Sequence, residues 1–353
     1  MELTQTDPPL SVEEVLLAFR NRGMPLEAMR YDVTPTGLHY LLIHWDIPAA
    51  DAAAWRLEVG GAVEQPLSLS MHDIRSRPKV THTVTMECAG NGRAHLSPRP
   101  LGQPWLHEAV GTAEWTGTPL RGVLEDAGVR DDAVELVFTG ADSGYQGDVL
   151  QDYERSLTIA DATRPEVLLA YEMNGRALEP QHGFPLRLLV PGWYGMTSVK
   201  WLTKIDAVTT PFEGYQQAVA YRMQQHEDDP GTLVTRIVPR GLMIPPGITD
   251  YPARRRYVAP GRVALAGRAW SGLGPVKGVE VGVDGVWKHA VLAPPIGEFA
   301  WRGWTFDWDA TPGEHELSCR ASDAAGNVQP LKQPWSMGGF ANNLVQTVRA
   351  SVG

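Results

Sequence analysis

Residues 81–93 read THTVTMECAGNGR, and this stretch decides how the rest of the chain is interpreted. Thr81, Val84 and Thr85 favour a strand, and the small residues after Cys88 favour a turn. The pattern predicts a thiol at the end of a strand, with the Arg93 guanidinium five residues further on. A thiolate is a ligand for a soft metal, and a nearby cation helps to keep it ionised. The alternative is a buried structural cysteine.

A second stretch, residues 168–202, carries several cationic or donor groups between turns rich in glycine and proline. His182 lies in a Gln-His-Gly-Phe-Pro turn, and Arg187 stands at the entry to a strand over 186–190. Ser198, Val199 and Lys200 follow a second turn. Arginine, lysine and turn amides are good phosphate ligands. The alternative is that Arg187 and Lys200 are surface charges whose stems cover the core.

Composition describes a globular protein with a large core and limits its partners. The chain has 353 residues, 43% of them hydrophobic, with 12 tryptophans and a formal net charge of −10. This length favours two domains. Without a basic run, nucleic acid is not an expected partner. Two cysteines cannot build a disulfide framework, and no apolar run reaches the roughly 20 residues of a membrane helix.

The N-terminal sequence MELTQTDPPLSVEEVLLAF has neither a basic n-region nor an apolar h-region, so we expect a cytoplasmic protein. The alternative is a periplasmic protein whose export signal has been removed. Residues 11–21 predict a short amphipathic helix that Ser11 caps, with Glu14 three residues on. Val15, Leu16 and Phe19 share one face of this helix, and we expect that face to pack against the core.

Alternating strands dominate the remainder of the chain. We expect strands over 55–59, 67–69 and 134–139, helices over 71–75 and 120–127, and a loop over 140–144 that presents Asp142 as an acceptor. After residue 245 the pattern changes to short strands over 263–270, 279–283, 300–308 and 315–321, typical of an antiparallel sandwich. Cys319 falls on one of these strands and is expected in the core. The predicted domains are 1–234 and 235–353.

Residues 81–93 and 168–202 together resemble the sulfite oxidase family of molybdopterin-dependent oxidoreductases, in its haem-free bacterial type. The first stretch resembles the segment with the cysteine ligand of molybdenum, and the second resembles the pterin-binding segment. The resemblance implies an α+β fold: a mixed α/β sulfite-oxidase-type molybdopterin domain followed by an immunoglobulin-like antiparallel β-sandwich. It also implies an enzyme, a molybdenum-dependent oxidoreductase.

The same resemblance assigns site residues. Cys88 would be the metal ligand, Arg93 would face a substrate oxyanion, Trp105 would form a pocket wall, and the Tyr221 phenol would hydrogen-bond the oxyanion or gate protons. The residues that would line the pterin are Tyr40, His44, Asp142, His182, Arg187, Ser198, Val199 and Lys200.

The implied reaction is oxidation of sulfite to sulfate by oxo transfer at a Cys-ligated molybdenum. Electrons would pass to an external carrier such as a cytochrome, or to oxygen. The resemblance further implies a plain molybdopterin, no haem, and a homodimer formed through the C-terminal domain.

Two positions depart from the family pattern, because relatives carry arginine where this chain has Leu42 and Gly338. Losing two cations weakens the binding of a dianion unless other residues replace them. Arg99, Arg222 and Lys332 are the candidates. A sulfoxide or another less charged oxo donor is therefore the alternative substrate. The second alternative is a non-catalytic interaction protein with a structural Cys88.

Overall fold

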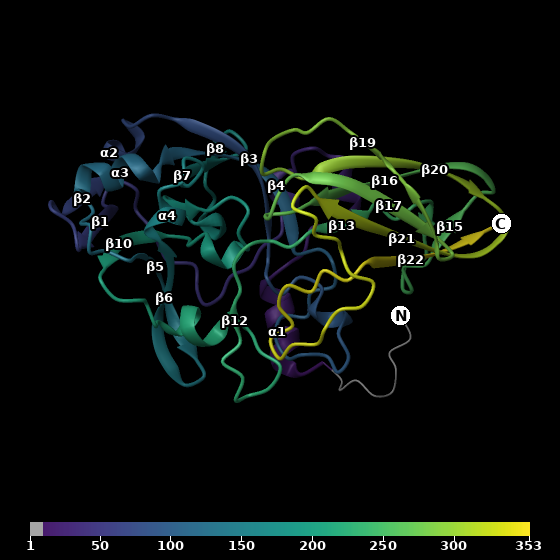
Figure 1. Ribbon diagram of the computed structural model, residues 1–353, viewed down its shortest axis with the longest axis horizontal. Helices are drawn as coiled ribbons and strands as arrows, with labels where there is room; N and C mark the ends of the chain where they lie inside the picture. The colour runs from purple at the N-terminus through teal and green to yellow at the C-terminus, as the bar shows by residue number, and fades with distance from the viewer. Residues whose placement is uncertain (1–9) are drawn as a thin grey trace. The chain divides into compact units, whose positions relative to one another are not determined.

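The structure, a computed structural model, describes residues 10–353, which form two compact units (Figure 1). The sandwich unit comprises the described residues up to Tyr40, Thr83–Thr112 and Arg236–Gly353. The mixed-sheet unit comprises Leu41–His82 and Ala113–Thr235. Residues 1–9 lie outside the described part. The predicted first domain begins within these residues, and so does the N-terminal sequence on which the cytoplasmic prediction rests.

A five-stranded sheet forms the centre of the mixed-sheet unit. Its order is β2 (Leu67–Ser70), β1 (Arg56–Gly61), β10 (Leu202–Val208), β5 (Glu135–Gln146) and β6 (Val149–Thr158), and the β1–β10 pair is parallel. The helices are α2 (Met71–Arg75), α3 (Leu120–Ala127) and α4 (Ile159–Ala162). Ser70 and Asp73 form a capping box on α2, and Gly128 ends α3 at φ 64°. The predicted α2 and α3 are confirmed.

The predicted loop over 140–144 is wrong, because β5 continues through it to Gln146. The register against β6 shifts between Thr139 and Ser143, and Asp142 lies within this irregularity with 5% exposure. Gly140 and Gly144 look like turn residues in the sequence. The strand nevertheless continues through both, because β5 pairs with β6 on either side of the register shift. A β-bulge therefore positions Asp142.

A smaller sheet completes the mixed-sheet unit. The end of β4 (Val110–Pro119) pairs with β7 (Leu168–Met173), which also pairs with β8 (Arg176–Ala177) and β9 (Arg187–Leu189). The unit also contains the short turns η4 (Pro180–His182) and η5 (Gly195–Thr197) and the π-helical turn η6 (Gln216–Ala220). A further pair of strands is β11 (Arg222–Met223) and β12 (Thr232–Leu233).

Two facing sheets give the sandwich unit its core. One has the order β13 (Arg240–Met243), β16 (Gly261–Trp270), β20 (Arg302–Ala310), β19 (Val291–Leu292). The other has the order β14 (Ile248–Thr249), β15 (Arg256–Val258), β22 (Gln346–Val352), β21 (Gly313–Asp323), β17 (Val276–Val283), β18 (Val286–His289). The pairs are antiparallel except β15–β22. Cys319 of β21 is fully buried in this core, as expected.

The N-terminal helix α1 (Val12–Arg20) forms with the predicted capping box between Ser11 and Glu14. Its predicted packing is wrong: Leu16 is 60% and Phe19 is 85% exposed. The side chain that α1 buries is Glu14, which forms an ion pair with Arg99. Short turns η1 (Leu26–Arg30) and η2 (Thr36–Leu38) follow. Among residues 10–353, no helix is long and apolar enough to cross a membrane.

Candidate functional site

Cys88 directly follows β3 (Val80–Glu87) in the sandwich unit, so the predicted strand and turn are confirmed. Its amide donates to the Ala109 carbonyl (2.9 Å), and its carbonyl accepts from the Asn91 amide (3.0 Å), which closes the turn. The residue is 8% exposed. Burial raises the pKa of the Cys88 thiol, while the Gly90 amide, the Arg93 charge and the Trp105 indole oppose this shift.

A buried polar network holds the Cys88 turn in place. Asn91 donates to Glu87 (3.0 Å) and accepts from the Ala109 amide (3.1 Å). Glu87 in turn accepts from the Trp270 indole (2.7 Å) and pairs with Arg240 (3.1 Å). Burial raises the pKa of Glu87, and Arg240 is the strongest opposing influence. The sequence gives no signal for the Glu87–Arg240 pair, because its two members are far apart along the chain.

Arg93 begins the short turn η3 (Arg93–His95) and is 8% exposed. Its Nε donates to the Gly338 carbonyl (2.6 Å), one Nη donates to the Gln103 carbonyl (3.2 Å), and its Cζ lies 5.1 Å from the centre of the Phe340 ring. Glycines make this packing possible: a Cβ at Gly90 would lie 2.7 Å from an Arg93 Nη. Backbone carbonyls therefore aim the guanidinium.

The positions that depart from the family pattern have structural roles of their own. Gly338 supplies the carbonyl that binds Arg93, and a Cβ there would lie 2.3 Å from the Phe340 ring. In the mixed-sheet unit, the Leu42 carbonyl accepts from Lys200 Nζ (2.7 Å). Of the three candidate replacement cations, Arg99 pairs with the buried Glu14, Arg222 donates to the Pro230 and Gly231 carbonyls, and Lys332 is exposed.

The predicted pterin residues of the second stretch gather in the mixed-sheet unit. Arg187 is 4% exposed, donates to the His182 carbonyl (3.0 Å) and the Ser198 carbonyl (2.9 Å), and lies over the Trp115 ring at 4.8 Å. The Ser198 hydroxyl accepts from the Val190 amide (3.1 Å), and the Val199 carbonyl accepts from the Leu188 amide (2.8 Å). Backbone at Gly183 adopts φ +102° where Lys200 and Arg187 come close, a conformation that suits glycine.

Asp142 is buried and Lys200 is partly buried, and the charge of each residue affects the pKa of the other. Burial lowers the pKa of Lys200 to about 7, and the Arg187 charge adds to this shift. Burial also raises the pKa of Asp142 to about 6, although the Lys200 charge opposes the change. Within the described residues, Oδ1 of Asp142 is buried without a hydrogen-bond partner. A ligand with an N–H donor and an anionic group would satisfy both residues.

His44 and Tyr221 belong to one polar cluster of the mixed-sheet unit. His44 Nε2 bonds Gln146 Oε1 (2.8 Å), and Gln146 also accepts from Gln216 Nε2 (2.9 Å). Burial lowers the pKa of His44. Gln216 opens η6, and Tyr221 follows the end of that turn with 7% exposure. Single π-helical turns are frequent at functional sites.

The predicted site residues thus fall into two groups. Cys88, Arg93, Trp105 and Tyr40 lie in the sandwich unit, where the Tyr40 ring stacks on His39 at 5.1 Å. The other eight lie in the mixed-sheet unit: His44, Asp142, His182, Arg187, Ser198, Val199, Lys200 and Tyr221.

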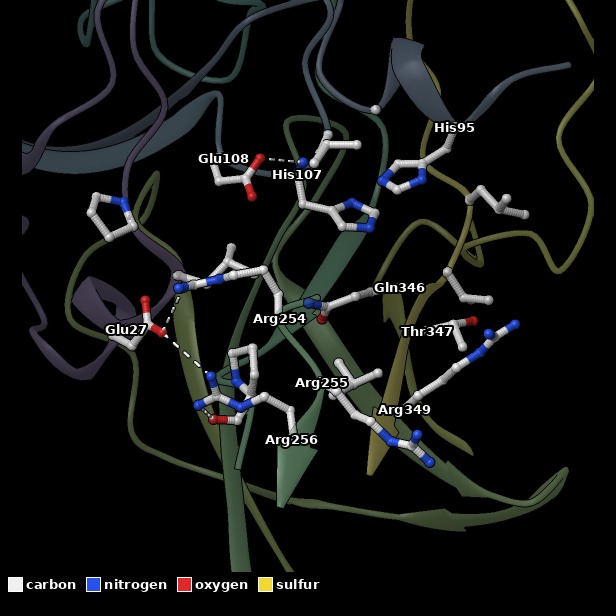
Figure 2. A pocket seen from close by; sticks show the side chains of 18 of the residues that line it. Glu27, His95, His107, Glu108, Arg254, Arg255, Arg256, Gln346, Thr347 and Arg349 are labelled. Atoms are coloured by element: carbon white, nitrogen blue, oxygen red, sulfur yellow. Dashed lines mark hydrogen bonds and ion pairs between the residues drawn. The ribbon is translucent and has the colours of Figure 1, made fainter. Parts of the chain in front are cut away.

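The sandwich unit also contains a pocket of about 780 Å³ (Figure 2). On its wall, Glu27 forms ion pairs with Arg254 (3.8 Å) and Arg256 (3.7 Å), and the rings of His95 and His107 stack at 4.2 Å. Burial lowers the pKa of His95 to about 4. Gly92 and Arg240, which line the pocket, also belong to the network around the Cys88 turn. The pocket is therefore lined in part by residues that hold the Cys88 turn in place.

Two protein families match this chain, and together they define its class. Residues 44–216 match the family described as "Oxidoreductase molybdopterin binding domain", and residues 249–352 match "Mo-co oxidoreductase dimerisation domain". A buried cysteine on a strand-end turn and a cluster of buried cations agree with this class, a molybdopterin oxidoreductase with a C-terminal dimerisation domain.

Curated relatives of similar sequence include sulfite oxidases. The chain is 37% identical to "Sulfite oxidase" of Gallus gallus over 316 residues, which is 84% of this chain and 68% of the relative. It is 36% identical to "Sulfite oxidase, mitochondrial" of Mus musculus over 340 residues, covering 91% of this chain and 62% of the relative's length. The chain belongs to the sulfite oxidase family.

A solved structure has the same fold. The sulfane dehydrogenase SoxCD from Paracoccus pantotrophus superimposes with a TM-score of 0.82 at 26% identity, over 100% of this chain and 89% of that one. The predicted fold, a mixed α/β molybdopterin domain with a β-sandwich, is confirmed.

Proposed function

We propose that this protein oxidises sulfite to sulfate at a molybdenum bound through Cys88. The observation that carries the proposal is the turn that presents a buried thiol and, five residues later, a buried guanidinium aimed by backbone carbonyls. Arg93 would bind an oxygen of the oxyanion. The Tyr221 phenol is predicted to hydrogen-bond the oxyanion or to gate protons. In buried surroundings such interactions are stronger than in water.

The residues present fit a molybdopterin. Cys88 would bind the metal as a soft thiolate, Arg187 and Lys200 would supply cations for a phosphate, and Asp142 Oδ1 would supply a buried acceptor that has no partner among the described residues. His44, His182, Ser198, Val199 and Tyr40 would line the pterin. When bound, the metal supplies two-electron oxo transfer, while this chain binds and orients the anion.

The test is sulfite-dependent reduction of ferricyanide or cytochrome c by protein that contains about one molybdenum per chain. Turnover at micromolar sulfite is the expected result. A loaded protein that ignores sulfite would refute the assignment, and reduction of a sulfoxide by a reduced dye would then support the alternative substrate. Protein that never carries molybdenum would favour the non-catalytic interpretation.

The sequence also led to expectations about the oligomeric state, the electron carrier, haem, the location and the domain division. The dimerisation-domain match over 249–352 supports a homodimer formed through the sandwich, which sedimentation would detect. An external electron carrier such as a cytochrome, no haem on the chain, a cytoplasmic location and the domain division at 234/235 stay predictions.

A further inference from the structure

Arg155 is a buried arginine whose donors are largely unused. It lies on β6, is 1% exposed, and donates through one Nη to the Gln216 carbonyl. Its Nε and its other Nη are buried and have no hydrogen-bond partner within residues 10–353. A buried guanidinium with two unpartnered donor nitrogens is unfavourable unless a ligand or water binds them.

The side chains around Arg155 include two phenols. Its Cζ lies 5.5 Å from the centre of the Tyr221 ring. Tyr153, two residues earlier on β6, donates its hydroxyl to the Met196 carbonyl (2.9 Å). Burial lowers the pKa of Arg155, and Tyr153 and Tyr221 oppose that shift. The guanidinium therefore stands beside the phenol that the proposed function assigns to the oxyanion.

The surroundings hold this guanidinium in a fixed place. Gln216, which accepts from it, is anchored through Nε2 to Gln146 (2.9 Å) and Gln151 (2.8 Å) of the β5–β6 hairpin. The same Gln146 binds His44 (2.8 Å). A cation so fixed loses little entropy when it binds an anion.

We propose that Arg155 is a specificity-determining residue that binds the substrate oxyanion beside Tyr221. The inference rests on the proposed function, and it gives the mixed-sheet unit a cation for the anion. Charge-assisted hydrogen bonds from Nε and Nη to one or two oxygens would satisfy the idle donors.

A structural role is the competing explanation. Arg155 would then only fix η6 through the Gln216 carbonyl, with buried water on its other donors. Replacement would in that case lower stability without changing the affinity for an oxyanion, so binding and stability must be measured separately.

The experiment compares Arg155→Met and Arg155→Lys with the parent enzyme, all loaded with molybdenum. Calorimetry measures the Kd for sulfate, the unreactive product, and steady-state kinetics measure KM and kcat for sulfite. Arg75→Met is the matched control, because Arg75 also lies over a tyrosine ring, Tyr171 at 5.6 Å, but is exposed.

We expect Arg155→Met to raise both the sulfate Kd and the sulfite KM about ten- to hundredfold. Arg155→Lys should recover part of this loss, and Arg75→Met should match the parent. Unchanged Kd and KM in Arg155→Met would overturn the proposal while sulfite oxidation stands. If Arg155→Met does not fold, parent-like constants in Arg155→Lys would overturn it, because one ammonium cannot replace two guanidinium donors.

The two proposals can fail separately. A parent enzyme that binds sulfate through Arg155 but does not oxidise sulfite would support the oxyanion site and refute the substrate. A parent enzyme that neither binds sulfate nor oxidises sulfite would refute both.

Discussion

Glu87 and Arg240 form an ion pair of 3.1 Å in which the side chains are 1% and 2% exposed. Glu87 ends β3 immediately before Cys88, and Arg240 begins β13 of the sandwich. Arg240 also donates to the Asn91 carbonyl (3.1 Å). A strand of the sandwich therefore fixes the turn that presents the thiol.

Removal of one member of this pair should damage both stability and cofactor retention. We expect Arg240→Met to lower the free energy of unfolding by about 3–5 kcal/mol, because Glu87 is left buried without its cation. Denaturant unfolding and molybdenum content measure the two effects. Arg262→Met, which breaks the exposed pair with Asp307, is the control and should change neither. Parent-like stability of Arg240→Met would contradict this expectation and would mean that Glu87 is protonated or hydrated in the variant.

The two cysteines should respond differently to substitution. Cys88→Ser is expected to lower sulfite turnover on the order of a thousandfold, because a hydroxyl is a much poorer ligand for a soft metal. Cys319→Ala should keep full turnover, because Cys319 lies in the sandwich core. Turnover and the visible absorbance of the loaded protein check both variants. Equal turnover in Cys88→Ser and the parent would favour a structural Cys88.

Local signals allow some elements to be predicted from the sequence. The capping residues of α2 and the glycine that ends α3 lie within the elements or next to them, and both helices form where expected. The final strand β22 is not among the predicted strands, even though its residues alternate between buried and exposed. The family motifs direct attention to Cys88, whose strand-end turn the structure confirms.

Long-range contacts explain what the sequence could not show. The apolar face of α1 predicts packing, but the ion pair with Arg99 buries Glu14 instead. That ion pair also removes Arg99 from the candidate replacement cations. Arg155 lies between Glu154 and Ser156 in the sequence, and the carbonyl that it binds belongs to Gln216 of η6, far along the chain.

The orientation of Arg93 should depend on Gly90. A methyl group at Gly90 would lie 2.7 Å from an Arg93 Nη and 2.9 Å from its Cζ, so the guanidinium must move. We expect Gly90→Ala to raise the sulfite KM about tenfold, roughly 1.4 kcal/mol, with molybdenum content unchanged.

Gly122→Ala is the matched control for Gly90→Ala. Gly122 lies within α3, and a methyl group added there would meet no atom within 4 Å. Its replacement should leave KM unchanged and stabilise the protein by up to about 1 kcal/mol. A Gly90→Ala enzyme with the parental KM would argue against a role for Arg93 in anion binding.

Asp142 should give the cofactor-free protein a specific dependence on pH. Its pKa is raised from 3.8 to about 6 in the folded state, so the stability it contributes is full below pH 3.8 and is lost as pH rises through about 6. Because an amide side chain cannot ionise, we expect Asp142→Asn to gain up to about 3 kcal/mol relative to the parent between about pH 4 and pH 8.

A carboxylate with the opposite shift provides the control for that measurement. Hydrogen bonds from Ser70 lower the pKa of Asp73, so its contribution is present above its unfolded pKa and is lost as pH falls. Asp73→Asn should therefore lose stability relative to the parent at neutral pH and approach it in acid. Urea unfolding of the cofactor-free proteins across this range measures both differences. If Asp142→Asn parallels the parent at every pH, the carboxyl is solvated, and its role as a buried acceptor for the pterin falls with it.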